Sequence, residues 1–230
     1  MNPAQHVLAI QTAPRPKGSS LERTLAALQS AGLNEWCGPK LIVSDGYSPK
    51  APGWEIDAST HTHGSSPTLI RLLEQAVSRW PDLQMLTRFE DDVIFTRNAL
   101  TYIQPFVVDS DLAFVSWYSY LWFNGRAREP WQHAQASQVR LFPLNCFFGS
   151  LGYTMPRRTV DTLLSQKANW TSRHRCDVFL RCASSPCFGV HYPNLIDHTD
   201  GTNSACGNGQ LGERVSRSFP GIEFDALTLC

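Results

Sequence analysis

Three consecutive acids, Glu90, Asp91 and Asp92, follow one short apolar segment and precede the apolar run at 93–95. An unpaired carboxylate beside buried apolar residues is costly, so such a cluster usually meets a cation. Mg²⁺ and Mn²⁺ prefer carboxylate oxygens and leave positions open for phosphate oxygens. The cluster therefore indicates a metal and phosphate site, although a solvated acidic turn would show the same residues.

A histidine near the other end of the chain fits the same chemistry. His198 follows a short apolar stretch and could complete an O/N ligand set for Mn²⁺ together with the acids. A lone histidine is more often an ordinary core or surface residue. Its pairing with an acidic strand end is what makes it a candidate.

These residues must be positioned by elements that the hydrophobic pattern predicts. Short apolar runs predict strands at 6–13, 40–45, 84–89 and 112–117. Apolar residues three or four positions apart predict helices at about 20–30, with Ser19 and Ser20 as N-cap candidates, and at 66–80. Further expectations are a loop with one short strand at 48–65, a loop at 124–138, a strand at 147–154, a helix from 156 and a short helix at 176–180.

Strands that alternate with amphipathic helices indicate an α/β fold with a mixed, mostly parallel sheet flanked by helices. Arg15, Asp45 and the three acids each follow a predicted strand. Ligands of parallel sheets bind at the carboxyl ends of the strands. We therefore expect these side chains to converge on one crevice.

The ordered motifs resemble those of metal-dependent glycosyltransferases of the GT-A fold, which is Rossmann-like. The likeness covers most of the chain and implies one domain, 1–230, with a nucleotide and donor half at 1–105 and an acceptor half at 106–230. The acids stand where that family has its "DxD" element, here in an E-D-D form. The segments that carry the likeness are 12–15, 43–46, 88–93, 145–153 and 192–198 with 201–204. The chain departs from the pattern at Asp200 and in its Gly- and Cys-rich tail.

The resemblance implies a role for each site residue. Asp92 would bind the metal directly, and His198 would touch the metal or the diphosphate. Glu90 and Asp91 would contact the ribose, the donor sugar or a ligand water. The nucleoside would be held by Asp45 and Arg15. The implied cofactors are Mn²⁺ or Mg²⁺ and a nucleotide-sugar donor, with a UDP-sugar preferred.

Asp177 is predicted to be the base that deprotonates the acceptor hydroxyl. It opens the short helix after the basic residues 173–175, and the family often places a catalytic acid in such a segment. A helix N-terminus and neighbouring arginines favour its ionised form. An acid that only stabilises the helix would suit the same position. With Asp177 as base, in-line displacement would invert the anomeric centre; Asp109, Asp111 and Glu129 are weaker candidates.

The acceptor is the part of the reaction that the sequence leaves open. Aromatic residues at 120–131 could form a sugar-stacking wall, whereas Trp117 is expected in the core. Arginines at 126–128, 157–158 and 173–175 could face phosphates, although scattered surface arginines are the favoured explanation. The candidate acceptors are a glycan, a small molecule, a protein side chain or a hydroxymethylated DNA base. His61 and His63 are expected to face solvent.

The amino-acid composition limits the classes of partner and function that remain. The net charge of zero gives no argument for long nucleic acid or acidic membranes as partners. Seven cysteines without a CxxC pair predict free thiols, and no apolar run approaches the roughly 20 residues of a membrane span. With no signal-like start, a cytoplasmic protein is expected. The alternatives are a metal-dependent nuclease or nucleotidyltransferase, which would need further helical carboxylates, and a non-catalytic carbohydrate- or nucleotide-binding module.

Overall fold

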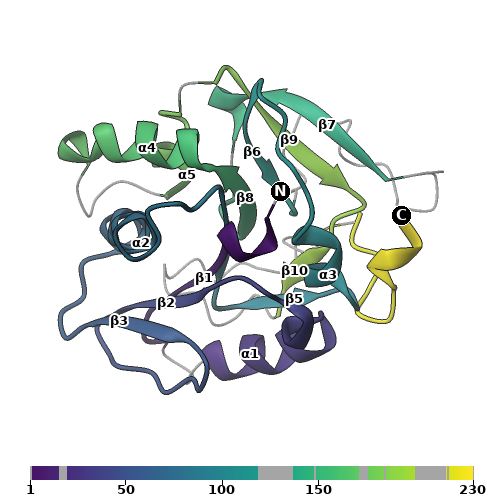
Figure 1. Cartoon of the computed structure of the whole chain (residues 1–230), viewed down its shortest axis with the longest axis horizontal. Coiled ribbons are helices and arrows are strands. Elements are labelled where there is room, and N and C mark those ends of the chain that lie inside the picture. Colours follow the sequence, from purple (N-terminus) through teal and green to yellow (C-terminus); the bar gives the residue numbers. More distant parts are fainter. Residues whose placement is uncertain are drawn as a thin grey trace.

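The computed structural model describes residues 2–15, 20–118, 137–147, 149–170, 176–183, 185–199, 216 and 218–229. Its main feature is an eight-stranded sheet in the order β3-β2-β1-β4-β8-β6-β9-β7, seen in Figure 1. The strands of this sheet are β1 (His6–Thr12), β2 (Lys40–Asp45), β3 (Glu55–Ser59), β4 (Met85–Glu90), β6 (Leu112–Ser116), β7 (Gln138–Pro143), β8 (Gly152–Pro156) and β9 (Cys187–Tyr192). A second, antiparallel sheet joins β5 (Val93–Phe95) to β10 (Ile196–His198).

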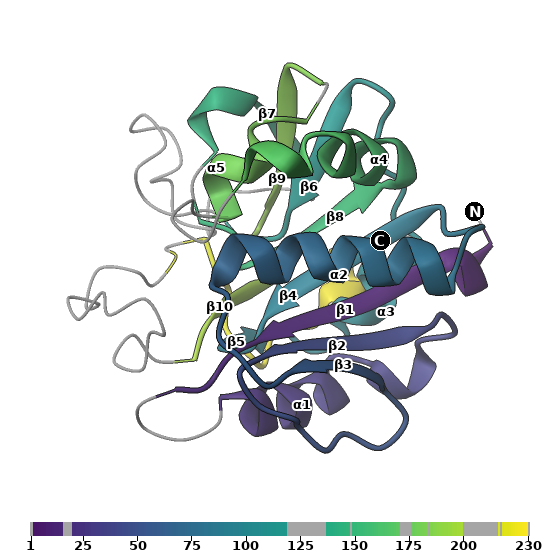
Figure 2. The same ribbon diagram turned by 90° about the vertical axis from the view of Figure 1, so that its left-hand side faces the viewer.

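Helices cover both faces of the main sheet because its strands are apolar on both sides. The helices are α1 (Leu21–Ser30), α2 (Ser65–Arg79), α3 (Ala99–Ile103), α4 (Arg157–Ser165) and α5 (Cys176–Leu180). Along β1, Val7 and Ala9 pack in one core with α2, α4 and α5. Leu8 and Ile10 point the other way, into a core shared with α1 and α3. Figures 1 and 2 show α1 and α2 on opposite sides of the sheet.

Strand direction decides where the site lies. Strands β3, β2, β1 and β4 run parallel. Their last residues, Ser59, Asp45, Thr12 and Glu90, therefore all lie at the carboxyl ends of the strands, on the same side of the molecule. Strand β8 runs antiparallel to β4 and pairs its first residue, Gly152, with Phe89. Of the seven pairings between described strands of this sheet, four are parallel. The expected class, a mixed and mostly parallel sheet flanked by helices, is confirmed.

The element predictions differ from the structure in identifiable places. The expected strand at 147–154 is wrong in its start, because 144–146 form a 3-10 turn and Gly149 adopts a positive φ of 88°. The strand therefore begins only at Gly152. The three-residue strand β5, the five-residue helix α3 and the strands β7 and β9 were not expected. Ser20 precedes α1, but its side chain makes no capping hydrogen bond, and Ser19 lies outside the described residues.

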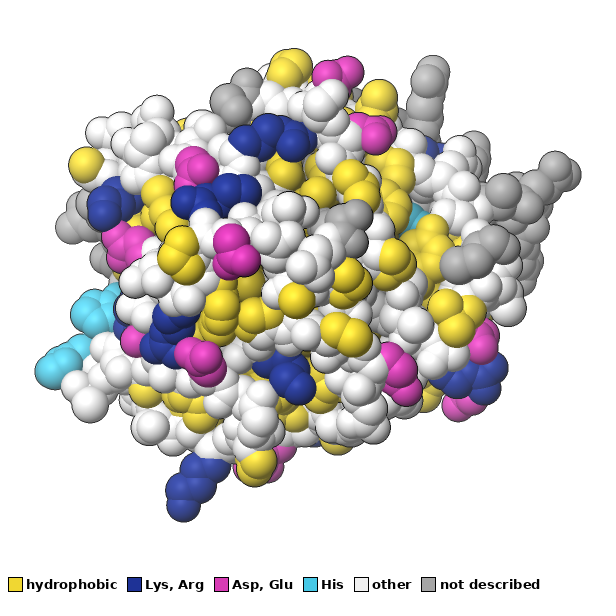
Figure 3. All heavy atoms as spheres, viewed as in Figure 1, with side chains coloured by type: hydrophobic (Ala, Val, Ile, Leu, Met, Phe, Trp, Pro, Cys, Tyr) yellow, Lys and Arg dark blue, Asp and Glu magenta, His cyan; other side chains and the backbone are white. Residues whose placement is uncertain are grey.

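The remaining observations concern membrane spans, cysteines and the exposure of individual side chains. Within the described ranges, no helix is long and apolar enough to cross a membrane. The five cysteines in these ranges are free thiols: Cys37, Cys146, Cys176, Cys182 and Cys187. His61 and His63 are exposed, and Trp117 is fully buried, as expected. On the face shown in Figure 3, acidic and basic side chains are interspersed.

Candidate functional site

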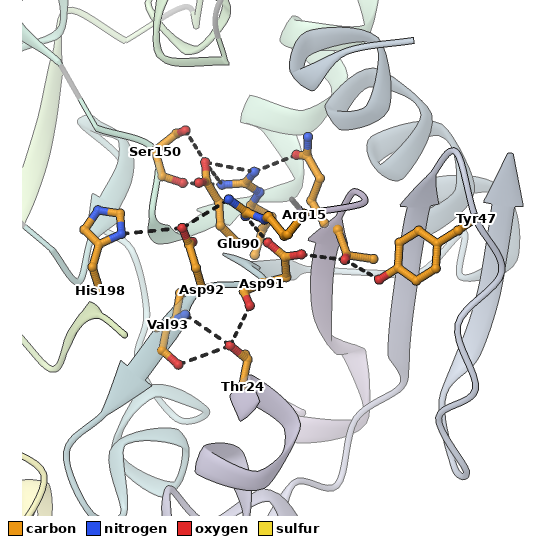
Figure 4. Close-up of polar contacts among 12 residues, drawn as sticks. Arg15, Thr24, Tyr47, Glu90, Asp91, Asp92, Val93, Ser150 and His198 are labelled. Carbon is orange, nitrogen blue, oxygen red and sulfur yellow. Dashed lines mark hydrogen bonds and ion pairs between the residues drawn. The ribbon is translucent and has the colours of Figure 1, made fainter. Parts of the chain in front are cut away.

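Asp91 is held at the carboxyl end of β4 by neighbours from β1 and from the loop after it. Its Oδ2 accepts a hydrogen bond of 2.6 Å from the Thr12 hydroxyl, and its Oδ1 accepts one from Arg15. The side chain is only 1% exposed. Tyr47 extends this chain with a hydroxyl contact of 2.6 Å to Thr12. Both Asp91 oxygens therefore have partners inside the protein, as Figure 4 shows.

The acidic turn itself is fixed by α1. The Thr24 hydroxyl donates to the carbonyl oxygen of Asp91 at 2.9 Å and accepts from the backbone N–H of Val93 at 3.1 Å. This side chain is fully buried. Thr24 thus ties the first helix to the backbone between Asp91 and β5, on which the orientation of Asp92 depends.

Asp92 faces His198 across the small sheet. The pairing of β10 with β5 sets His198 opposite Val93, and the Thr199 N–H donates to the Asp92 carbonyl at 2.9 Å. The Nδ1 atom of His198 lies 3.7 Å from Asp92 Oδ2. An Arg15 nitrogen lies 3.4 Å from the same oxygen. The other oxygen, Oδ1, is buried and receives no hydrogen bond from the described residues.

Glu90 is the third acid and turns toward β8. Its Oε1 accepts from the Ser150 hydroxyl at 2.7 Å and from both terminal nitrogens of Arg88, at 3.3 and 3.4 Å. Arg88 is 1% exposed and also donates to Gln11 Oε1 at 2.6 Å and to the Ser150 carbonyl. All hydrogen bonds to Glu90 from described residues fall on Oε1. Because the side chain is 29% exposed, Oε2 remains accessible.

The charges of the cluster reinforce one another. Burial disfavours the charged form of Arg15, but Asp91 and Asp92 outweigh that effect and raise the pKa of Arg15. Burial alone would raise the pKa of Asp92, yet His198 and Arg15 lower it. For His198, burial opposes protonation, but the nearby Asp92 raises its pKa. Asp92 is therefore ionised and flanked by two cationic or potentially cationic groups.

Asp45, at the carboxyl end of β2, is the next of the expected site residues. The Asp45 carboxylate is buried and accepts from the backbone N–H groups of His63 and Gly64, at 2.9 to 3.0 Å. It thereby fixes the loop that leads into α2, whereas Arg15 lies against Asp91 and Asp92. The joint contact of Asp45 and Arg15 with a nucleoside stays a prediction.

Asp177 is buried near the start of α5, beside Cys176. Burial raises the pKa of the Cys176 thiol to about 11, and the charges of Arg88 and Glu90 also act on it. Helix α5 therefore begins close to the Arg88–Glu90 pair. The role of Asp177 as a base stays a prediction.

The residues around Asp92 fit a hard divalent cation that is shared with a ligand. Among the residues that the structure describes, no group of three or more His, Cys, Asp or Glu side chains is arranged to hold a metal ion by itself. Mg²⁺ needs none, since one or two carboxylates and substrate phosphates suffice. Ligands of one octahedral ion with bonds of about 2.1 Å lie about 3 to 4 Å apart. The 3.7 Å between Asp92 and His198 falls in this range, and Asp92 Oδ1 adds a buried oxygen without a donor.

Several site residues were missed at the level of sequence. Arg88 and Gln11 are polar residues in predicted strands that also hold adjacent apolar residues, and this is the signal that could have identified them. Arg88 and Glu90 are two positions apart, so alternation along a strand places them on the same face. Thr12, Thr24 and Ser150 gave no such signal, because single hydroxyl residues are common in strands, helices and loops alike.

Other expectations fall outside the described part of the chain. These are the aromatic wall at 120–131, the arginines at 126–128 and 173–175, Glu129, and the segment 201–204. Arg157 and Arg158 are described, and both donate to backbone carbonyls, of Pro81 and of Asp109 and Leu112 respectively. They thus brace α4 against neighbouring loops. This use of their guanidinium groups favours a structural role over a phosphate-binding one.

Comparisons with known proteins identify no family for this chain. No family model matches it, and neither does any curated protein. Among solved structures, a mannosyltransferase from Pyrobaculum calidifontis, PcManGT, in complex with GDP-Man and Mn²⁺, matches with a TM-score of 0.49 and 12% identity. The match covers 75% of this chain and 49% of that protein, so the chain spans about half its length. Because this likeness is so distant, the functional conclusion rests on the site itself.

Proposed function

We propose that this chain is a metal-dependent glycosyltransferase that takes its sugar from a nucleotide-sugar donor. The carrying observation is the carboxylate of Asp92, which is ionised and buried, has one oxygen without a donor among the described residues, and faces His198. Such a carboxylate at the carboxyl edge of a parallel sheet suits a cation that also binds a diphosphate. The expected order of motifs along the sequence supports the same assignment.

In this proposal Asp92 and His198 hold Mn²⁺ or Mg²⁺. When bound, the ion would stabilise the negative charge that develops on the leaving nucleoside diphosphate. Each oxygen of Asp91 accepts one hydrogen bond, from Thr12 and from Arg15, and the expected contact of Asp91 with the donor stays a prediction. Asp91 orients Arg15, whose other terminal nitrogen lies near Asp92.

Glu90 is proposed to receive a hydroxyl of the donor sugar. Arg88 and Ser150 fix its Oε1, so the accessible Oε2 has a defined direction. A carboxylate oriented in this way needs little reorganisation when it accepts a hydrogen bond. Asp177, near the start of α5, is proposed to remove the proton of the acceptor hydroxyl, which makes the reaction inverting. An anomeric NMR assay that shows retention would contradict this last assignment.

The two halves of the chain have separate parts in this proposal. Residues 1–105 supply the donor site, and residues 106–230 supply the acceptor side together with His198. A UDP-sugar is the first donor to test. The acceptor is sought among glycans, small hydroxyl compounds, protein side chains and hydroxymethylated duplex DNA.

The test is release of nucleoside diphosphate from UDP- and GDP-sugars with Mn²⁺ or EDTA. We expect Mn²⁺-dependent release by the wild type and its loss in Asp92→Asn, which keeps the size of the side chain. Asp161→Asn is the matched control, since Asp161 lies on α4 in an exposed pair with Arg157. No metal-dependent release from any sugar nucleotide would refute the proposal. Binding without release would favour the non-catalytic module, and cleavage of nucleic acid would favour the nuclease.

A further inference from the structure

The two proposed metal ligands lie at one end of a very small sheet. Strand β10 sets His198 opposite Val93 of β5, which directly follows Asp92. Each strand has three residues, and an isolated two-stranded sheet is at best marginally stable in water. Other contacts must therefore help to keep His198 turned toward Asp92. Some of them come from residues 216 and 218–229, which we call the C-terminal strap.

The first residues of the strap hold β10. The Asn194 backbone N–H donates to the Ser218 carbonyl at 3.0 Å, and the Asn194 side chain donates to the Ser216 hydroxyl at 2.6 Å. The Ser216 N–H donates to Asp197 Oδ2 at 3.0 Å, while Asp197 Oδ1 accepts from the His198 N–H at 2.8 Å. Asp197 is 1% exposed. A single buried carboxylate thus links the strap to the backbone of His198.

The end of the strap is fixed beside β5. Arg97 and Asn98 follow this strand, and Asp225 accepts from the Asn98 side chain at 2.9 Å and from Arg97 at 3.3 Å. The Ala226 N–H donates to the Arg97 carbonyl at 3.0 Å, and Ala226 is fully buried. In Figure 1 the strap, coloured yellow, accordingly lies beside α3 and the end of β5. The strap therefore links the two strands at the end of the small sheet away from the acids.

Between these two attachments the strap is loosely packed. Ile222 is 55% exposed, and the residues from 219 to 225 are half-buried or exposed. Segments with few buried apolar side chains open more easily than the rest of a protein. We therefore expect the strap to detach while the main sheet stays folded.

We propose that the C-terminal strap controls metal affinity, because the seated strap keeps His198 at Asp92. When the strap detaches, Asn194 and Asp197 lose buried hydrogen bonds, and β10 is held less firmly against β5. The apparent affinity for the ion then falls in proportion to the fraction of molecules in which the strap is seated. By linkage, the bound ion holds the strap in place by the same factor. The inference rests on the proposed function for its metal ion and adds a means of regulating that site.

The first test compares two arginine substitutions one residue apart on the strap. Ala226→Arg puts a long charged side chain at a fully buried position, so it should keep the end of the strap from seating. Leu227→Arg is the matched control, because Leu227 is 42% exposed. Mn²⁺ binding, measured from the EPR signal of free Mn²⁺, should be about tenfold weaker in Ala226→Arg and unchanged in Leu227→Arg. Equal affinity in the two variants would overturn the inference.

A second test uses the wild type alone, so it does not depend on the folding of a variant. Hydrogen exchange followed by mass spectrometry reports detachment of the strap, whose N–H groups we expect to exchange faster than those of β1. Mn²⁺ at about ten times its Kd should slow exchange in the strap about tenfold, because the detached state binds the ion poorly. Exchange in the strap that is as slow as in β1, or that Mn²⁺ leaves unchanged, would contradict the proposal.

Neither test needs a sugar nucleotide, so the strap and the proposed function can fail separately. Coupling between Mn²⁺ and the strap, without release of nucleoside diphosphate from any donor, would refute the proposed function and support the role of the strap. Metal-dependent release with equal Mn²⁺ affinity in Ala226→Arg and Leu227→Arg would refute the role of the strap alone. Absence of Mn²⁺ binding to the wild type would refute both.

Discussion

The histidine at the start of β1 gives a sharp prediction for stability against pH. His6 is fully buried, with Nδ1 at 2.8 Å from the Gln104 carbonyl and Nε2 at 2.7 Å from the Thr87 hydroxyl. A carbonyl oxygen only accepts, so Nδ1 carries the proton and Nε2 accepts from Thr87. Thr87 then accepts from Thr154, which accepts from the Trp117 indole N–H at 2.8 Å. Each donor in this series, from the Trp117 indole through the two threonine hydroxyls to His6, therefore finds an acceptor only if His6 is neutral.

Protonation of His6 reverses this chain. The Thr87 hydroxyl would have to accept a hydrogen bond from Nε2 and donate its own proton to Thr154. The hydroxyl proton of Thr154 would then have no acceptor in this series of hydrogen bonds. Burial accordingly lowers the pKa of His6 from 6.5 to about 4, although the Gln104 carbonyl favours protonation. Between these two pH values the unfolded chain binds a proton that the folded chain does not, so stability falls as the pH falls. At about 1.4 kcal/mol per pKa unit, the loss is about 3 kcal/mol and is complete near pH 4.

Urea unfolding followed by tryptophan fluorescence, at a series of pH values from about 7 to 4, measures this loss. His6→Gln is the comparison, because glutamine can donate to a carbonyl and accept from a hydroxyl without titrating. We expect the wild type to lose about 3 kcal/mol more than His6→Gln over this range. An equal loss in both proteins would refute the directional argument. His191, whose pKa burial lowers to about 4 against the Pro193 carbonyl, should behave in the same way.

Three further predictions concern the site. Thr24→Val leaves the buried N–H of Val93 without its acceptor and should cost about 1–3 kcal/mol in urea unfolding; a cost near zero would show that Thr24 does not fix the acidic turn. Gly152→Ala puts a Cβ 2.4 Å from Ile196 Cδ1 and from Phe89 Cδ1, so it should cost about 1–3 kcal/mol. Because Ile196 belongs to β10, the same variant should weaken Mn²⁺ binding at His198, and unchanged stability and affinity would count against this packing. Asp177→Asn should lower kcat by about 10²–10⁴-fold and leave the Kd for the nucleotide unchanged, as expected for loss of a general base. An equal loss in kcat and in nucleotide affinity would instead assign Asp177 to binding.

The central strands could be predicted because buried strands contain runs of consecutive apolar residues, which are visible in the sequence. Strands β1, β2 and β4 lie between neighbours and are covered on both faces, so nearly every position is buried and each strand holds a run of adjacent apolar residues. Strands β5 and β10 have three residues each, which is too short for any period to show. Yet their pairing is what brings His198 to Asp92. His198 and Asp92 are more than 100 residues apart along the chain, so only the chemistry of the two side chains and the family resemblance suggested that they meet.

The hydrogen bonds of Asp45 show a second feature that could not be predicted from the sequence. Its position at the end of β2 was predicted, and the strand is confirmed. Its carboxylate, however, binds the N–H groups of His63 and Gly64, which the chain presents because Gly64 has a φ of 101°. That conformation is readily available to glycine and cannot be inferred from spacing. A strand end therefore locates an acid without showing which donors it will meet.

The donors around the acidic cluster, rather than the acids themselves, determine what each acid can do. Asp91 holds Thr12 with one oxygen and Arg15 with the other. Glu90 meets Arg88 and Ser150 on one oxygen and keeps the other. Asp92 is ionised and buried and has one oxygen without a donor among the described residues, so a cation that binds there gains the most. Three adjacent carboxylates thus give an anchor for Arg15, an oriented acceptor and the proposed metal ligand.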